Sequence, residues 1–169
     1  MDALLPRPAA PLPSQSDFDP SGGDLDAQSA WKNFGGHTLA EAYAKFLTVP
    51  EVYQEDFMFM GYRAFAYYFP VVDYYLRSVS LAPDDLGDCE AAMLGSGITN
   101  QLSAKNVACS AGLIREIESL HTFVIQNVAR YAATPKDERR IRREWKHVAV
   151  AIQHHRSVTK SQGSGSTST

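Results

Sequence analysis

Residues 56–77 read DFMFMGYRAFAYYFPVVDYYLR, and the rest of the chain must fold around this stretch. It holds nine of the eighteen Phe, Tyr and Trp side chains of the protein. Each buried ring removes a large apolar area from water, while each tyrosine hydroxyl needs a partner or solvent. The pattern therefore predicts a core helix with a kink at Pro70, many of its rings lying at the rim of the core. The alternative is that the same stretch also presents a partner-binding face.

Helix signals recur on both sides of this stretch. Thr38 and Glu41 form a capping box, in which each side chain satisfies a backbone N–H at the helix start, and Thr48 with Glu51 repeats it. The helices expected are 38–48, 48–60, 63–69, one from Pro70 onward, 84–102, 103–133 and 134–156. No segment shows sustained apolar and polar alternation between hairpin signals. The sequence predicts an all-α, single-domain bundle of about five to seven helices.

Apolar residues at helical spacing predict which faces of the later helices point inward. The inward positions are Val72, Tyr75, Leu76 and Val79 after Pro70, then Leu113, Ile117, Leu120, Val124, Val128 and Tyr131, and finally Ile141, Trp145, Val148 and Ile152. Gly95 and Gly97 each weaken a helix by about 1 kcal/mol relative to Ala. The run Gly95-Ser96-Gly97 is therefore either a packing contact or a break.

The two ends of the chain have a different composition from its middle. Residues 1–30 are rich in Pro, Ser, Gly and Asp, and they are expected to be disordered because they bury little. A minor alternative lays Phe18 on the core or on a partner. The helical domain is expected over residues 31–156, followed by a flexible tail over residues 157–169. No cationic start precedes an apolar run and no run is long enough to cross a bilayer, so the protein is expected to be cytoplasmic, without a membrane partner.

Charge is divided unevenly along the chain although the net charge is only -3. Residues 1–90 carry 14 acidic and 5 basic groups, whereas residues 91–169 carry 5 acidic and 11 basic groups. Such asymmetry is typical of two polar faces, or of an acidic surface that meets a basic partner. Neither Cys89 nor Cys109 has metal-binding spacing, so reduced buried thiols are expected, with a single disulfide left open.

Two Glu-x-x-His motifs favour a second hypothesis, a di-iron-like metal enzyme. Glu118 with His121 and Glu144 with His147 each share a helix face, as in bundles where two such motifs meet further carboxylates. The motifs lie on consecutive helices without a carboxylate helix between them, and the flanking residues of the last helix are cationic. The sequence therefore predicts no metal and no cofactor. No nucleophile motif or convincing carboxylate pair is present, so no enzymatic activity is expected.

A third hypothesis is nucleic-acid binding by the cationic segment Arg139–Lys146. Basic helices can follow phosphates. Asp137, Glu138 and Glu144 interrupt this row, and interspersed charge is more typical of a solvated helix face. The sequence therefore favours an exposed face with pairs such as Glu138 to Arg142, and nucleic-acid binding is not the expected function.

A family resemblance begins at Trp31. The residues that carry it are Trp31, Phe34-Gly35-Gly36, Thr38-Leu39, Glu41-Ala42, Asp56-Phe57, Met60 and Ala64–Pro70. Over residues 31–76 the chain resembles small helical bacterial proteins of unknown function that share a Trp anchor and an Ala-Phe-x-Tyr-Tyr-Leu-Pro core. Phe69 stands where these proteins have Leu. The resemblance implies an immunity or accessory factor encoded near a toxin, and it carries over no functional residues.

The function expected from these patterns is binding of another protein, most concretely a cognate toxin that an immunity-type protein neutralises by covering its active site. Acidic side chains would speed the encounter with a basic cleft, and tyrosines are enriched in interfaces. The predicted partner-binding residues are Glu51, Tyr53, Glu55, Asp56, Tyr74, Tyr75, Asp84, Asp85, Asp88 and Glu90. The sequence does not indicate an oligomeric state.

Overall fold

The computed structural model describes residues 11–79, 90–103 and 110–163. These residues hold no strand, which confirms the all-α class. The elements are α1 (Gln15–Phe18), α2 (Leu25–Phe34), α3 (Leu39–Phe46), α4 (Pro50–Tyr53), α5 (Asp56–Phe59), α6 (Tyr62–Ser78), α7 (Glu90–Ser103), α8 (Ala111–Gln126), the 3-10 helix η1 (Val128–Arg130) and α9 (Pro135–Gly163). The described part has more helices than the five to seven predicted, because several of them are single turns. Cys89 and Cys109 lie outside the described residues.

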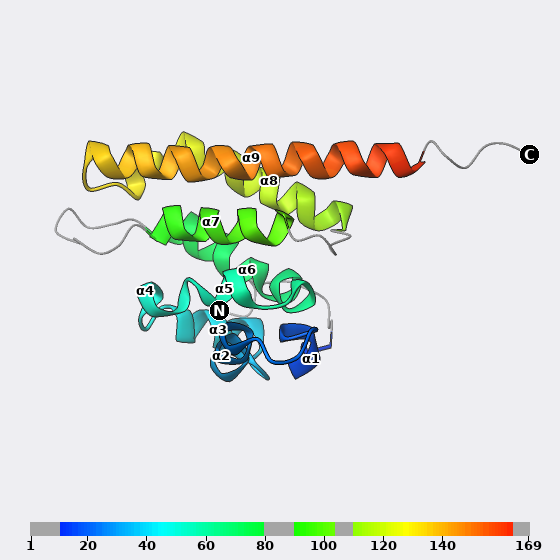
Figure 1. Ribbon diagram of the computed structural model, residues 1–169. Coiled ribbons are helices and arrows are strands. Elements are labelled where there is room, and N and C mark those ends of the chain that lie inside the picture. Colours follow the sequence, from blue (N-terminus) through cyan, green and yellow to red (C-terminus); the bar gives the residue numbers. More distant parts are fainter. Residues whose placement is uncertain (1–10, 80–89, 104–109, 164–169) are drawn as a thin grey trace, which may run out of the picture.

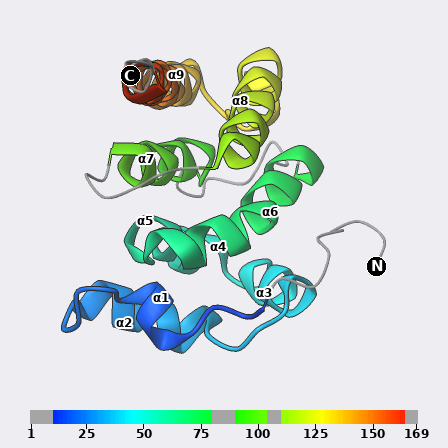
Figure 2. The same cartoon turned by 90° about the vertical axis from the view of Figure 1, so that its right-hand side faces the viewer.

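The helices form successive layers (Figures 1 and 2). One end holds α1, α2 and α3, the middle holds α4, α5 and α6, and the other end holds α7, α8 and α9. Within this arrangement α5 packs between α2 and α7, and α9 packs along α7 and α8. The middle layer therefore touches both ends, as expected for the segment richest in aromatic rings.

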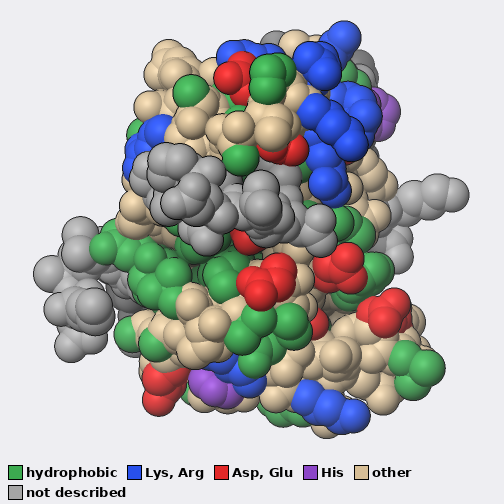
Figure 3. Space-filling view, turned by 90° about the vertical axis from the view of Figure 1, so that its left-hand side faces the viewer, with side chains coloured by type: hydrophobic (Ala, Val, Ile, Leu, Met, Phe, Trp, Pro, Cys, Tyr) green, Lys and Arg blue, Asp and Glu red, His purple; other side chains and the backbone are tan. Residues whose placement is uncertain are grey.

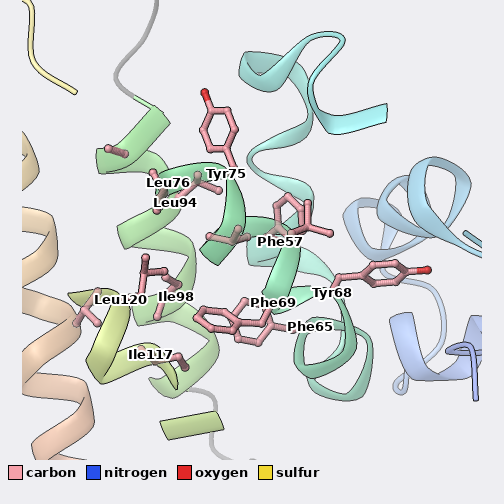
Figure 4. Packing of buried hydrophobic residues seen from close by; sticks show 14 of the residues in the cluster. Phe57, Phe65, Tyr68, Phe69, Tyr75, Leu76, Leu94, Ile98, Ile117 and Leu120 are labelled. Carbon is pink, nitrogen blue, oxygen red and sulfur yellow. The ribbon is translucent and has the colours of Figure 1, made fainter. Parts of the chain in front are cut away.

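Helix α6 is the centre of the core and continues through Pro70. The predicted end of one helix at Phe69 is therefore wrong, while the predicted change of axis at Pro70 stays a prediction. Proline removes one backbone hydrogen bond, and burial of both flanks of α6 outweighs that loss. Phe65 and Phe69 point toward α7 and α8, while Tyr68 points the opposite way toward α1 and α2 (Figure 4). The Tyr68 hydroxyl donates to the Phe34 carbonyl at 2.6 Å, the partner that a buried tyrosine requires.

Of the two capping boxes predicted from the sequence, one is present in the structure and the other is not. The box at Thr38 and Glu41 is present and begins α3. The second box, at Thr48 and Glu51, is wrong, because the Thr48 hydroxyl donates to the Lys45 carbonyl at 2.7 Å instead. Pro50 is the first residue of α4, so its fixed φ and missing N–H set that helix start in place of the box.

The N-terminal segment is folded where the structure describes it, which corrects the expected disorder for residues 11–30. Phe18 is fully buried, and its ring lies edge-on to Trp31 at 5.3 Å. The Gly61 N–H donates to the Phe18 carbonyl at 2.7 Å, and a Cβ on Gly61 would lie 2.3 Å from the Asp17 carbonyl oxygen. One aromatic side chain and this close approach hold a segment whose mean composition predicts disorder. Residues 1–10 lie outside the described residues.

The C-terminal boundary also differs from the prediction. Helix α9 extends to Gly163, beyond the expected end of the helical domain at residue 156. Its predicted inward stripe of Ile141, Trp145, Val148 and Ile152 is confirmed as buried, as is the stripe from Leu113 to Tyr131. Across the described segments, no helix combines the length and apolar character needed to cross a membrane.

Candidate functional site

The clearest candidate for a binding surface lies at the end of α3 and on α4. We define the α4 surface as Leu47, Glu51, Val52, Tyr53 and Glu55. Val52 is 61% exposed and Leu47 is 47% exposed, and both glutamates are exposed. Hydrophobic and acidic side chains lie next to one another on the side of the molecule where α4 is found (Figure 3). This combination of exposed apolar and acidic groups suits a partner that is basic and partly apolar.

Tyr53 joins this surface to the core. Its ring is half-buried and packs edge-on against Phe34, with ring centroids 5.8 Å apart. The Lys45 ammonium lies 5.4 Å from the same ring, within the range of a cation–π interaction. A half-buried tyrosine that is fixed by a core ring loses little rotamer entropy on binding, as an interface anchor should.

Tyr74 is also half-buried, but it belongs to a different neighbourhood. Its ring packs edge-on against Tyr43 of α3 at 4.8 Å. Glu90, the first residue of α7, is half-buried as well. Asp84, Asp85 and Asp88 lie outside the described residues, so their predicted role stays a prediction.

Two of the predicted contact residues lie in the core instead. Asp56 is 7% exposed, and one of its oxygens accepts a 2.8 Å hydrogen bond from Asn33 Nδ2 on α2. Tyr75 is 4% exposed, and its ring stands perpendicular to that of Phe46 at 4.8 Å. Both side chains are part of the core packing and are not available to a partner in this conformation.

Burial also changes the chemistry of Asp56. It raises the pKa of this carboxyl from its ordinary value of 3.8 to about 6, against the hydrogen bond from Asn33 and the charge of Lys45. Nearby in the chain, Gln54 is 3% exposed and its Oε1 has no hydrogen-bond partner among the described residues. Sequence reasoning missed this buried polar pair, although two polar residues directly before an aromatic run were a usable signal.

Both glutamates of the Glu-x-x-His motifs are engaged in ion pairs. Glu118 accepts from Arg156 at 2.7 Å, and Glu144 lies 2.8 Å from Arg143 and 3.5 Å from His147. His121 is half-buried, and burial lowers its pKa. No group of three or more possible metal ligands occurs within the described part of the chain.

The cationic residues of α9 are largely solvent-exposed. Arg139, Arg142, Arg143 and Lys146 are exposed, and Glu138 lies 4.0 Å from Arg142 in the predicted pair. Lys and Arg side chains gather at the end of the molecule that holds α9 (Figure 3). The acidic α4 surface and the basic α9 face are therefore separated on the molecule as well as along the chain.

Known proteins give no direct guide to either surface. Comparisons with protein-family models, with curated proteins and with solved structures found no match to this chain. The function is accordingly proposed from the geometry and charge of the described residues.

Proposed function

We infer that this protein is a cytosolic protein-binding module of the immunity type, which neutralises a bacterial toxin by covering the toxin's basic active-site cleft. The observation that carries this inference is the α4 surface, where exposed Val52 and Leu47 stand beside exposed Glu51 and Glu55. Apolar side chains gain free energy when a partner covers them, at roughly 25 cal/mol per Å². Carboxylates beside them favour a basic partner and raise its association rate.

The arrangement of charges supports a binding role more than a catalytic one. On α4 the acidic groups are exposed and spread along the surface, where they steer a partner but do not converge on a reacting atom. The two Glu-x-x-His carboxylates are occupied by Arg156 and by Arg143. The proposed function therefore includes no catalytic step.

Affinity purification from the native host tests the proposal. The tagged wild-type chain should recover a basic protein that mass spectrometry identifies. The double substitution Glu51→Lys with Glu55→Lys should weaken its affinity for the recovered partner by at least roughly ten-fold, because two attractive charges become repulsive. Glu116→Lys is the matched control, since Glu116 is exposed on α8 and not on the α4 surface.

Four results would count against this function. One is recovery of no partner by the wild-type chain, and another is equal binding by the wild type and the double variant. The third is stoichiometric iron, manganese or zinc in the purified protein, which would favour the metal-enzyme alternative. Salt-sensitive binding of plain duplex DNA, detected by fluorescence polarisation and lost when Arg139 and Arg143 are replaced, would instead favour the nucleic-acid alternative.

A further inference from the structure

A hollow of about 640 Å³ lies between the α1–α2 turn, α5 and α7. Cavities of roughly 300–1,000 Å³ are the usual size of sites that enclose a small ligand or a partner's side chain. Residues from 16–27, 58–63 and 100–101 line it, so three distant parts of the chain build it together. On the left of Figure 2 the α1–α2 turn, α5 and α7 lie one above the other. The described residues that line the hollow include none of the α4 surface.

One part of this hollow is apolar and open to solvent. Phe59 lines it and is 37% exposed, and the half-buried Met58 lines it beside Phe59. Leu25, which is 79% exposed, follows the lining residue Asp24 at the start of α2. Exposed apolar side chains around a concave surface are typical of ligand sites. An aliphatic stem or an apolar neighbour of a charged group would therefore gain free energy here.

The other part of the hollow is acidic. Asp17, Asp19 and Asp24 line it, and Arg63 is the one cation among the described lining residues. Arg63 lies 3.7 Å from Asp17, and its side chain is 84% exposed. Within the described lining, Asp19 and Asp24 have no such cation, so the hollow has an unbalanced negative charge that favours a cationic ligand.

Backbone hydrogen bonds hold both of these carboxylates in place without a ligand. Asp24 caps α2 by accepting from the N–H groups of Asp26 at 2.9 Å and Ala27 at 3.1 Å. Asp19 accepts from the N–H groups of Gly22 at 2.9 Å, Gly23 at 2.7 Å and Asp24 at 3.2 Å, and from the Ser21 hydroxyl at 3.4 Å. A carboxylate offers about four acceptor positions, so Asp24 retains the capacity to accept from a ligand. The positions of Asp19 are taken by the chain itself, and this residue contributes its negative charge. Positions fixed in advance lower the entropy lost on binding.

We propose that this hollow receives an arginine side chain from a basic segment of a protein partner. The guanidinium donates to the Asp24 carboxylate, and the negative charge of Asp19 adds to the attraction. The aliphatic stem packs on Phe59 and Met58, where the aromatic face also attracts the cation. The inference rests on the proposed function in taking a protein as the ligand, and it adds a second contact region to the α4 surface.

Titration of the full chain with acetyl-Leu-Arg-amide, followed by ¹H–¹⁵N correlation spectra, tests the proposal. Shift changes should cluster in residues 16–27 and 58–63 and in the side-chain amides of Asn100 and Gln101, with a roughly millimolar Kd. The citrulline analogue has nearly the same shape without the charge, and it should give no such cluster. The dipeptide is small enough that the result does not depend on finding the toxin.

Asp24→Asn should weaken the affinity for the dipeptide by roughly two- to five-fold, which is the effect of losing one exposed charge pair. Asparagine caps helices as well as aspartate does, so α2 should remain intact. Asp26→Asn is the matched control, because it removes the same charge two residues away outside the lining. Phe59→Ala provides a second test that leaves the Asp24 cap of α2 unchanged, and it should also weaken the affinity for the dipeptide.

Equal binding of the citrulline analogue, absence of the shift cluster, or equal affinity in all variants would overturn the arginine site. If the host partner is recovered but the dipeptide produces no shifts, the proposed arginine site is wrong and the α4 surface remains the proposed binding region. If the dipeptide binds as expected but no partner is recovered, the arginine site stands and the immunity function is wrong.

Discussion

At the scale of single residues, buried Asp56 makes stability depend on pH. Burial raises its pKa from 3.8 to about 6, so the folded state prefers the protonated acid. Its stabilising contribution is complete below the unfolded pKa and is lost as pH rises through the folded pKa. The rise in pKa corresponds to roughly 2–3 kcal/mol, which is a large part of the stability of a small domain.

Asp56→Asn should therefore raise the free energy of unfolding at pH 7 by about 2 kcal/mol. Asparagine keeps an oxygen that can accept from Asn33 Nδ2 and has no charge to desolvate. Urea denaturation of the variant and the wild type at several pH values measures the difference. It should vanish near pH 4 and grow between pH 4 and about 6.

The variant must be compared with the wild type at each pH, because other carboxylates change the stability of both proteins in the opposite direction to Asp56. The Ser14 backbone N–H and hydroxyl hold the pKa of Asp17 below its ordinary value, so Asp17 stabilises the fold less as pH falls. Asp26→Asn, at an exposed position of α2, is the control for the removal of one carboxylate that is not buried. A variant at Asp56 that is less stable than the wild type at pH 7 would contradict this account.

At the scale of elements, the contact between α7 and α9 depends on a glycine. A Cβ on Gly95 would lie 2.8 Å from Trp145 Nε1, and this nitrogen donates to the Ala91 carbonyl at 2.7 Å. A Cβ on Gly97 would lie 3.6 Å from Met58, an ordinary contact distance. Of the two possibilities for Gly95-Ser96-Gly97, the packing contact is therefore confirmed, and α7 continues through all three residues.

Identical substitutions at these two glycines should have opposite effects. Gly95→Ala should lower the free energy of unfolding by roughly 1–3 kcal/mol, because displacement of Trp145 outweighs the gain in helix propensity. Gly97→Ala should raise it by up to about 1 kcal/mol, since the added methyl fits. Thermal unfolding followed by circular dichroism measures both. Equal changes in Tm would show that helix propensity, and not the contact with Trp145, decides the outcome.

The same two helices show which elements the sequence could predict. The stripe from Ile141 to Ile152 was predictable because burial of a long helix face follows from spacing along one segment. The continuity of α6 through Pro70 was not, because packing from α7 and α8 on one side and α2 on the other overrides a local penalty. The predicted capping box at Thr48 is absent for a similar reason, because the Thr48 hydroxyl donates to the Lys45 carbonyl instead.

The candidate site was predictable in its chemistry and not in its exposure. Glu51 and Glu55 are exposed as expected, whereas Asp56 is buried directly after them. One residue along a helix turns the side chain by about 100°, so neighbouring acids can face solvent and core. The hollow was not predictable at all, because residues 16–27, 58–63 and 100–101 meet only in three dimensions.

At the scale of the whole molecule, the N-terminal segment belongs to the folded unit. Phe18→Ala should lower the free energy of unfolding by about 3–5 kcal/mol, since a fully buried ring against Trp31 and Tyr68 is lost. Leu25→Ala is the control, because Leu25 is 79% exposed and should change stability by at most about 0.5 kcal/mol. Denaturant unfolding of both variants decides between a folded segment and the disordered tail that composition predicts. If Phe18→Ala unfolded at the same denaturant midpoint as the wild type, the N-terminal segment would be a disordered tail.

The separation of charge across the molecule determines how binding of the proposed partner should respond to salt. Charges on exposed Glu51 and Glu55 act over about 10 Å at 0.1 M salt and over about 3 Å at 1 M. Stopped-flow association should therefore slow by roughly ten-fold between about 0.05 and 0.5 M NaCl, with little change in the dissociation rate. Glu51→Gln with Glu55→Gln should flatten this dependence, whereas Glu116→Gln should not. If salt acted mainly on dissociation, the carboxylates would act within the bound complex and not during the approach of the partner, and acidic steering would be the wrong explanation for the recognition.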